Sequence, residues 1–449
     1  MTSEYERKRL ENIKENNRIL KELGLDVVDM SSPAKPKPKP KPKTTPKRKA
    51  DESPLPRRVS LRNRGQDPDG SERKELAEVI EIQRQKENEE RSRLVGTIKV
   101  EASEDFQSLH ERSNKESLFD LKPKSVSNFV NVIPDGSVKI VPDMIYCIAF
   151  NPFSNNLMSV QGGKSGNIVF WDIEKSLEQI ETNPDELLDP VIHTFKPHVA
   201  PVYKLQYLDS NSLFSCSVDG SIRKMDIVKG QFDEVYVHPD EVSINYFDLV
   251  KQGGWFSTSQ GEIGQFDLRK RLGSLKATYL ASSKKINTVH VNPRHEHLLC
   301  TAGLDGTVRI FDVRNLKSSE DLIDPLLSFQ HSKSVNSAFW DPTGTDIIST
   351  SFDDTLNLWK SAHSDNSQHI KIRHNNNTGR WIQKFKAEWD KQNILIGNMK
   401  RSVDIFNNQG DLESKLEETV TAIPAVNVGH PTLPLILSGN GSGKMMLWK

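Results

Sequence analysis

Cysteines are scarce in this sequence, and long apolar stretches are missing. Three cysteines, Cys147, Cys216 and Cys300, occur in 449 residues, without the spacing of a metal site or a disulfide framework. No run approaches the roughly 18 apolar residues of a transmembrane helix, and residues 1–16 lack the apolar core of a secretory signal. These absences argue against a disulfide-stapled secreted domain and a helical membrane protein. We expect a soluble intracellular protein that has reduced core cysteines and no membrane contact.

Net charge gives no indication of a partner, because 61 Lys and Arg balance 61 Asp and Glu. The distribution of charge is more informative. Residues 31–66 contain 12 Lys and Arg against two acidic residues, and residues 33–49 read PAKPKPKPKPKTTPKRK. Proline at alternate positions removes backbone donors and favours extended conformations, which predicts a disordered basic linker. A solvated tail, a nuclear import signal and a phosphate-binding segment all fit this composition.

Helical segments are predicted on both sides of this linker. Residues 5–23 are amphipathic, which indicates a helix that is loose, docks on its own body or binds a partner. Residues 71–94 are rich in helix formers, and residues 96–100 fit a short strand. The predicted organisation is an amphipathic helix in residues 1–30, the basic linker in 31–70, a helical or irregular extension in 71–121 and a β-rich domain in 122–449.

A repeated hairpin unit dominates the β-rich domain. It is clearest in residues 298–314, LLCTAGLDGTVRIFDVR, where alternating apolar residues flank the turn dipeptide Asp305-Gly306. Six other segments share its turn position and its apolar anchor five residues later. The anchors, spaced by 41 to 54 residues, are Trp171, Met225, Phe266, Phe311, Trp359, Phe406 and Trp448. Because each small sheet exposes two apolar faces, the units are expected to stack in a ring, as an all-β seven-bladed propeller.

The repeat units resemble WD repeats. Trp171-Asp172 retains the dipeptide that names this family. His331, Asp353 and Trp359 match the family's structural hydrogen-bond set, which links a loop, a turn and a strand. The resemblance implies that this His–Asp pair stabilises a blade and does not catalyse a reaction.

Three features depart from the family pattern. Met225 replaces an aromatic anchor in the second unit, and Arg401 replaces the turn glycine in the sixth. The first complete unit begins on an inner strand and the last ends on an outer one. Ring closure by strand exchange is therefore expected only if residues 137–141 supply the missing strand.

No constellation typical of an enzyme, a metal centre or a cofactor site occurs in the sequence. Residues 161–166, QGGKSG, superficially evoke a phosphate loop, but they lack its spacing and its following helix, and a strand hairpin explains them. Propellers without such features usually act as binding platforms. We therefore expect a non-enzymatic protein without a metal or a cofactor.

Residues 299–314 form the first candidate site. They resemble the box by which WD-repeat substrate receptors dock on the adaptor of cullin-type ubiquitin ligases, and Asp305, Asp312 and Arg314 match its charged positions. The preceding repeat matches the end of the box but has Gln260 where the upstream acid should be. The alternative is that Asp312 and Arg314 simply finish a surface strand.

The loop HNNNTGRWI, residues 374–382, forms the second. Its amides and cation suit hydrogen bonds to phosphates and bases, and its tryptophan suits stacking on an unstacked base. Basic residues near blade edges, including Lys384 and Lys386, extend a basic rim. Alternatively, Trp381 begins a buried strand and the asparagines shape a turn. The candidate DNA contacts are Lys284, Lys285, Arg373, His374, Asn375, Asn376, Asn377, Arg380, Trp381, Lys400 and Arg401.

Together with the N-terminal helix and the basic linker, this loop resembles that of the fungal DNA-damage-binding WD-repeat family, relatives of the metazoan WD-repeat protein seventy-six. A more distant resemblance is to the propeller subunit of the ultraviolet-damaged-DNA-binding complex, whose wedge sequence is not reproduced here. The resemblance implies binding of single- or double-stranded DNA, damaged DNA above all, and a nuclear location, with a cytoplasmic pool left open. The alternative is an interaction scaffold or ubiquitin-ligase receptor that contacts the ligase adaptor or chromatin proteins, with DNA affinity only from the basic arm.

Overall fold

The computed structural model describes residues 85, 94, 96–99, 106, 129–133, 136–153, 156–182, 190–269, 275–317, 321–364, 368–379, 382–417 and 420–449. The chain divides into two compact units, 1–73 and 74–449, and every described residue belongs to the second. The helix expected in residues 1–30, the linker expected in 31–70 and most of the extension expected in 71–121 lie outside the described residues.

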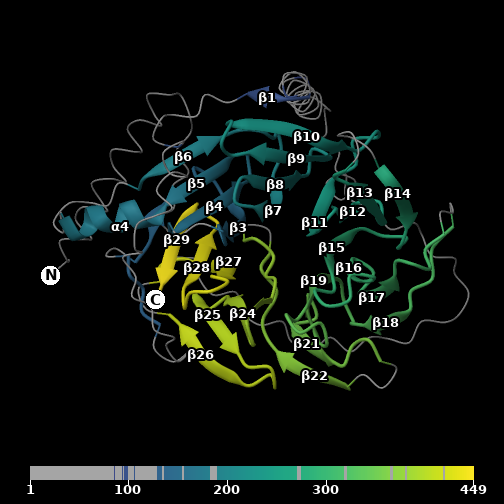
Figure 1. The fold of residues 1–449 in the computed structure, drawn as a ribbon. Helices are drawn as coiled ribbons and strands as arrows, with labels where there is room; N and C mark the ends of the chain where they lie inside the picture. Colours follow the sequence, from purple (N-terminus) through teal and green to yellow (C-terminus); the bar gives the residue numbers. More distant parts are fainter. Residues whose placement is uncertain are drawn as a thin grey trace, which may run out of the picture. The chain divides into compact units, whose positions relative to one another are not determined.

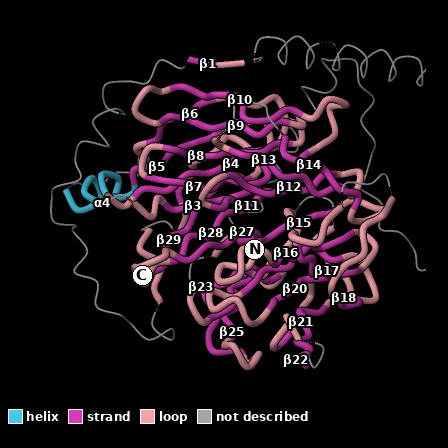
Figure 2. The backbone as a smooth tube through the Cα atoms, turned by 45° about the vertical axis from the view of Figure 1, so that its right-hand side comes forward, coloured by secondary structure: helices cyan, strands magenta, loops and turns pink. Residues whose placement is uncertain are grey.

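Seven antiparallel sheets of four or five strands follow one another around a ring, so the predicted seven-bladed propeller is confirmed. In Figure 1 the blades succeed one another in chain order, from the blue β3–β6 to the yellow β27–β29. Each blade runs from an inner strand at the channel to an outer strand at the rim, as in the order β15-β16-β17-β18. In Figure 2 the helix α4 (Ile173–Thr182) lies beside the strands, between β5 and β6 in the chain.

The blades use consecutive strands, apart from β1 and β2. Blade 1 comprises β3 (Ile145–Phe150), β4 (Met158–Gly163), β5 (Ile168–Asp172) and β6 (Ile192–Phe195). Blade 2 comprises β7 (Val202–Asp209), β8 (Ser212–Ser217), β9 (Ser221–Asp226) and β10 (Gln231–Val237). Blade 3 comprises β11 (Ile244–Val250), β12 (Gly253–Thr258), β13 (Glu262–Asp267) and β14 (Leu275–Leu280). Blade 4 comprises β15 (Ile286–Val291), β16 (Leu298–Gly303), β17 (Thr307–Asp312) and β18 (Leu327–Gln330). Blade 5 comprises β19 (Val335–Trp340), β20 (Ile347–Ser351), β21 (Thr355–Lys360) and β22 (Gln368–Arg373). Blade 6 comprises β23 (Glu388–Asp390), β24 (Asn393–Asn398), β25 (Ser402–Phe406) and β26 (Leu412–Leu416). Blade 7 comprises β27 (Pro424–Gly429), β28 (Ile436–Asn440), β29 (Lys444–Trp448) and β2 (Val138–Lys139).

The turn between the second and third strands sets the register of each blade. All seven residues at this position have a positive φ, and they are Gly166, Gly220, Gly261, Gly306, Asp354, Arg401 and Gly443. Glycine suits this left-handed conformation because it has no Cβ. Blades 2 and 6 form despite their departures from the repeat pattern. Met225 is fully buried, so a flexible thioether replaces the aromatic anchor, and Arg401 adopts a φ of 64°.

The ring closes by strand exchange. Val138 pairs with Met445 and Lys139 with Lys444, so β2 is the outer strand of blade 7. The pairing continues where Asn131 bridges to Trp448. Residues 137–141 therefore contain the strand that the sequence left in question.

Residues upstream of position 122 also pack on the propeller. The strand β1 (Ile98–Lys99) pairs with β10 as a fifth strand of blade 2, which confirms the short strand expected in residues 96–100. The buried Arg223 Nη1 donates to the carbonyl oxygen of Gly96 at 3.2 Å. Phe106 is fully buried, and its ring packs edge-on against Phe170 at 5.1 Å. A propeller without these residues would lose core contacts of blades 1 and 2.

The apolar core lies between adjacent sheets. Leu299 and Phe311 of blade 4, for example, belong to one buried cluster with Ile348 and Leu358 of blade 5. The three cysteines are buried and free, as expected. Burial raises the pKa of Cys147 to about 12, which keeps this thiol protonated and unreactive.

A buried hydrogen-bond chain stabilises blade 5. His331 Nδ1 lies 3.2 Å from Asp353 Oδ2, and His331 Nε2 lies 2.8 Å from Ser349 Oγ, which also accepts from Trp359 Nε1 at 2.8 Å. A carboxylate only accepts, so Nδ1 donates, and Nε2 accepts the Ser349 hydroxyl. The predicted set is confirmed with Ser349 added. An equivalent chain in blade 2, not recognised in the sequence, joins His198, Asp219 and Ser215.

We expect Asp353→Asn to lower the free energy of unfolding at pH 7 by about 1–3 kcal/mol, because it removes an acceptor of the buried His331. Although burial opposes it, hydrogen bonds from Thr355 and Ser332 and the neighbouring His331 lower the pKa of Asp353 to about 2. This lies below the unfolded value of about 3.9, so the contribution is present above pH 4 and is lost as the pH falls towards 2.

Urea denaturation at several pH values, followed by tryptophan fluorescence, measures this effect. Asp324→Asn is the matched control because Asp324 is exposed. An equal effect of the two substitutions, or an effect of Asp353→Asn that is as large at pH 2 as at pH 7, would contradict the assigned role.

Candidate nucleic-acid interface

The loops of the propeller gather at two ends of its strands. Because neighbouring strands are antiparallel, the turns between second and third strands lie at the same end as the loops that enter the next blade. Backbone hydrogen bonds join these two kinds of loop, from His331 N to Gly306 O and from His374 N to Asp354 O. We call this end the upper face and the other end the lower face.

Lys284 and Lys285 lie on the upper face, in the loop from β14 to β15. Lys284 is exposed, whereas Lys285 is half-buried, with its Nζ 5.5 Å from the centre of the Tyr203 ring. Burial, followed by the charges of Lys384 and Lys386, lowers the pKa of Lys285 to about 8. Lys284 therefore faces solvent, whereas Lys285 lines the central channel.

The loop after β22 alternates between exposed and buried side chains. Asn376 is fully buried, and its Nδ2 donates to the carbonyl oxygens of Ser351 at 2.8 Å and Thr355 at 3.0 Å. The buried His374 Nδ1 lies 2.8 Å from Asn376 Oδ1. These two side chains tie the loop to the turn of blade 5, so burial leaves neither available to a ligand on this face. The exposed members of the loop among the proposed contacts are Arg373, Asn375 and Asn377, and Arg380 and Trp381 lie outside the described residues.

Lys400 and Arg401 form the turn of blade 6 on the same face. Both are exposed, and Asn398 Oδ1 accepts from the backbone N of Lys400 at 2.9 Å. The loop of His374 reaches this blade, because His374 Nε2 lies 3.7 Å from Asp404 Oδ2. The structure therefore brings the loop and the turn of blade 6 together.

A further cation, Lys333, is exposed on the upper face in the loop from β18 to β19, and the sequence analysis did not single it out. An alignment of the repeats would have found Lys333, because it precedes β19 in the same way as Lys284 precedes β15. We define the basic arc as Lys284, Lys285, Lys333, Arg373, Lys400 and Arg401.

Carboxylates near the basic arc are already occupied by internal partners. Asp305 pairs with Arg309, with Oδ2 2.5 Å from Nη2. Asp353 belongs to the chain of blade 5, and Asp354 Oδ1 accepts from the backbone N of Asn376 at 3.0 Å. The outward-facing cations of the arc form no ion pair with any described residue, so the arc is free to attract an anion.

The three docking candidates do not lie together. Asp305 is on the upper face, whereas Asp312 and Arg314 follow the other end of β17, about 20 Å away for a six-residue strand. The exposed Arg314 forms a fork with Asp312, with Nε–Oδ1 2.9 Å and Nη2–Oδ2 2.7 Å. Asp267 and Arg269 make the same fork in blade 3.

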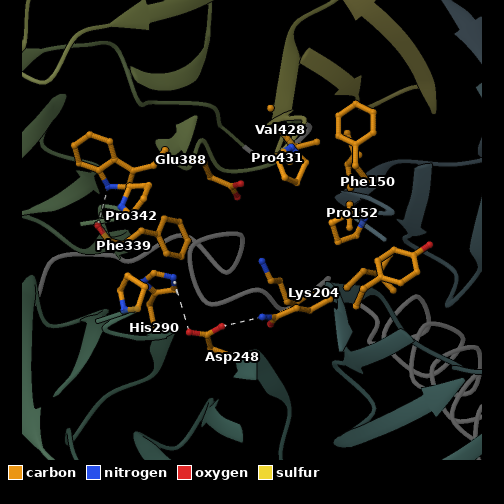
Figure 3. A pocket seen from close by; sticks show the side chains of 18 of the residues that line it. Phe150, Pro152, Lys204, Asp248, His290, Phe339, Pro342, Glu388, Val428 and Pro431 are labelled. Atoms are coloured by element: carbon orange, nitrogen blue, oxygen red, sulfur yellow. Dashed lines mark hydrogen bonds and ion pairs between the residues drawn. The ribbon is translucent and has the colours of Figure 1, made fainter. Parts of the chain in front are cut away.

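At the lower face the channel contains a cavity of about 460 Å³. Figure 3 shows Phe339 and Pro431 at its walls, with Lys204, Asp248 and Glu388 around its interior. Burial lowers the pKa of His290, which also lines the cavity. The lysine and the carboxylates offset one another, so this cavity lacks the excess of positive charge found in the basic arc.

The described part of the chain contains no group of three or more His, Cys, Asp or Glu able to hold a metal ion. No helix among the described residues is long and apolar enough to span a membrane.

The family profile "WD domain, G-beta repeat" matches residues 190–224, 273–312 and 323–360. Relatives match almost the whole chain. DNA damage-binding protein CMR1 of Phaeosphaeria nodorum and cmr1 of Neurospora crassa are each 30% identical over 99% of this chain and 98% of their own length. WD repeat-containing protein 76 of Xenopus laevis is 30% identical over 99% of this chain and 80% of its own length.

Proposed function

Because the chain belongs to the WD-repeat family of the fungal DNA damage-binding protein CMR1 and of WD repeat-containing protein 76, we propose that it is a non-enzymatic DNA-binding protein. We propose that it acts in the nucleus, in DNA metabolism or the DNA damage response, and prefers damaged DNA such as ultraviolet-irradiated duplex. The basic arc is the observation that carries DNA binding. The preference for damage rests on the names of the relatives, and the nuclear location on these names and the lysine-proline linker.

The basic arc supplies the phosphate contacts in this proposal. Six neutralised phosphates would give a salt dependence with a slope of about −5 in log–log form. The exposed Asn375 and Asn377 stand beside the arc and suit hydrogen bonds to base edges. Arg380 and Trp381 complete the proposed contacts, and the tryptophan is assigned to an unstacked base at a lesion.

The backbone of Arg401 gives this proposal independent support. Its φ of 64° lies where five other blades have glycine, and a side chain in this conformation costs roughly 1–2 kcal/mol. Such strain at an exposed turn is typical of a residue kept for its side chain.

We expect the triple substitution Lys284→Ala/Lys333→Ala/Lys400→Ala to weaken binding to duplex DNA by about 10- to 100-fold near 0.1 M salt. The salt slope should fall by about 3, because each lysine releases about one counterion. Gel shifts across a salt series, with and without residues 31–70, measure both quantities. Lys251→Ala/Lys276→Ala/Lys317→Ala removes the same charge from exposed lysines elsewhere.

Equal losses in the two triple variants would refute the basic arc as the interface. If deletion of residues 31–70 abolishes all DNA binding, the alternative of an interaction scaffold with a basic arm is correct. Trp381→Ala should reduce the preference for irradiated over intact duplex while leaving affinity for intact duplex nearly unchanged. A preference that survives this substitution would remove Trp381 from the lesion contact.

We also propose a protein-docking role for the lower face, favoured by the two identical forks of blades 3 and 4. The resemblance of residues 299–314 to an adaptor-docking box makes the adaptor of a cullin-type ubiquitin ligase the proposed partner, with chromatin proteins as the alternative. Asp305 is left out of this surface because it lies at the other end of β17.

For this surface we expect Arg269→Ala/Arg314→Ala to reduce recovery of the purified adaptor in a pull-down by at least about tenfold. The reason is that arginines near the centre of an interface often contribute much of its binding free energy. DNA affinity should not change, because the forks lie on the face away from the arc. Lys164→Ala/Lys415→Ala is the control, because both lysines are exposed and belong to blades 1 and 6. Unchanged recovery with the arginine variant would refute the docking surface.

A further inference from the structure

Three lysines line a small cavity at the upper end of the central channel. The cavity measures about 70 Å³, and its lining includes Lys285, Lys384 and Lys386 beside Tyr203 and Gln383. None of the described residues that line it carries a carboxylate. We call this cavity the mouth site.

Aromatic rings lie beside the lysines of the mouth site, although Lys384 is exposed and its Nζ lies 5.5 Å from the centre of the Phe352 ring. Lys384 and Lys386 flank Phe385, which is fully buried, so the period-two alternation of an extended chain turns both lysines to the opposite side, towards the channel. Lys386 Nζ lies 5.2 Å from the centre of the Tyr246 ring, which fixes the amine without neutralising it.

The channel wall behind these lysines is braced by amide side chains. Asn245 Nδ2 donates to the carbonyl oxygen of Ile286 at 2.8 Å, and Asn287 Nδ2 donates to that of Val335 at 2.7 Å. Each bond joins the inner strand of one blade to that of the next. A ligand at the mouth site therefore meets a preorganised wall, and binding orders little of the protein.

The amines of Lys384 and Lys386 also repel that of Lys285. Burial, then the charges of Lys384 and Lys386, depresses the pKa of Lys285, and burial depresses the pKa of Lys384 and Lys386 too. Glu388 lines an adjoining part of the channel together with Lys204, Lys384 and Lys386. Its charge favours the protonated form of Lys386, but it is not among the residues that line the mouth site. A multivalent anion among the three amines removes the remaining repulsion.

We propose that the mouth site binds a single phosphate group, held by Lys285, Lys384 and Lys386. A cavity of about 70 Å³ has room for a group of the size of a phosphate. Lysine binds phosphate as a point charge, so three of them recognise the charge without selecting its carrier. The carrier is therefore either a DNA phosphate or a free phosphorylated small molecule. The site itself does not depend on the proposed DNA binding.

Thermal unfolding of the full-length protein with pyrophosphate, against sodium chloride of equal ionic strength, tests the site. We expect the wild type to gain on the order of 2–5 °C at about 100 times the dissociation constant. Lys384→Met and Lys386→Met keep the length of the side chain and remove the charge. Each should unfold at no lower temperature than the wild type without pyrophosphate, because the cost of burying a charge is removed, and should gain less than half of the pyrophosphate shift.

Lys276→Met is the control, since Lys276 is exposed on β14 and does not line the mouth site. It should keep the full shift. A wild-type shift no larger than that in sodium chloride, or an equal shift in Lys384→Met and Lys386→Met, would overturn the proposal. If a methionine variant misfolds, isothermal titration of pyrophosphate into the wild type decides the matter, and absence of saturable 1:1 binding overturns the site.

Competition identifies the carrier. If a DNA phosphate fills the site, pyrophosphate at constant ionic strength weakens duplex binding by the wild type more than by Lys386→Met. If the carrier is a free molecule, pyrophosphate leaves duplex affinity unchanged while the thermal shift remains. Saturable pyrophosphate binding without any duplex binding would support the mouth site and refute the proposed DNA function, so the two failures are distinguishable.

Discussion

Asparagine side chains join the inner strands of blades 3, 4 and 5 around the channel by hydrogen bonds. Asn245 and Asn287 each occupy the second position of an inner strand and donate to the first residue of the next blade's inner strand. A buried amide without a partner would cost roughly 1–3 kcal/mol, so these bonds help to fix the rotation between blades 3 and 4 and between blades 4 and 5. The loops that carry Lys284, Lys285 and Lys333 lead into the inner strands β15 and β19, so the spacing of these lysines follows from that rotation.

This arrangement separates the candidate functions. Loops and turns of the upper face collect the cations, while the lower face presents the forks of Arg269 and Arg314. A protein that uses opposite ends of its strands can hold a nucleic acid and a protein adaptor together, because neither ligand covers the other. The rigid sheets in between also let each surface change in evolution without disturbing the other.

The sequence predicted the fold well because the repeat signal is local. Hairpin turns, alternating strands and anchors such as Trp171 each depend on a few neighbouring residues, and their recurrence identified all seven blades. The strand at residues 137–141 could be suspected for the same reason, since one outer strand was missing from the count. Phe106 could not be placed, because its partners lie in two other strands and no local pattern connects them.

The candidate site was less predictable, since it depends on the direction in which each loop side chain points. HNNNTGRW looked like one polar loop, but Asn376 turns inward to bond backbone carbonyl groups that only the folded blade supplies. Asp305 and Arg314 are close in sequence, and an intervening strand carries them to opposite faces. Lys384 and Lys386 were expected on the rim, and the burial of Phe385 places them in the channel.

The pairing of Val138 with Met445 has a consequence for synthesis of the protein. These partners are about 300 residues apart, so the contact that closes the ring can form only after all seven blades have been synthesised. Until residues 444–448 leave the ribosome, the preceding blades have an apolar sheet face and an unpaired strand edge at the gap, both of which favour association with other chains. A chain that stops before β29 should therefore aggregate instead of forming an open propeller, and chaperones that shield sheet edges have most to contribute at this stage.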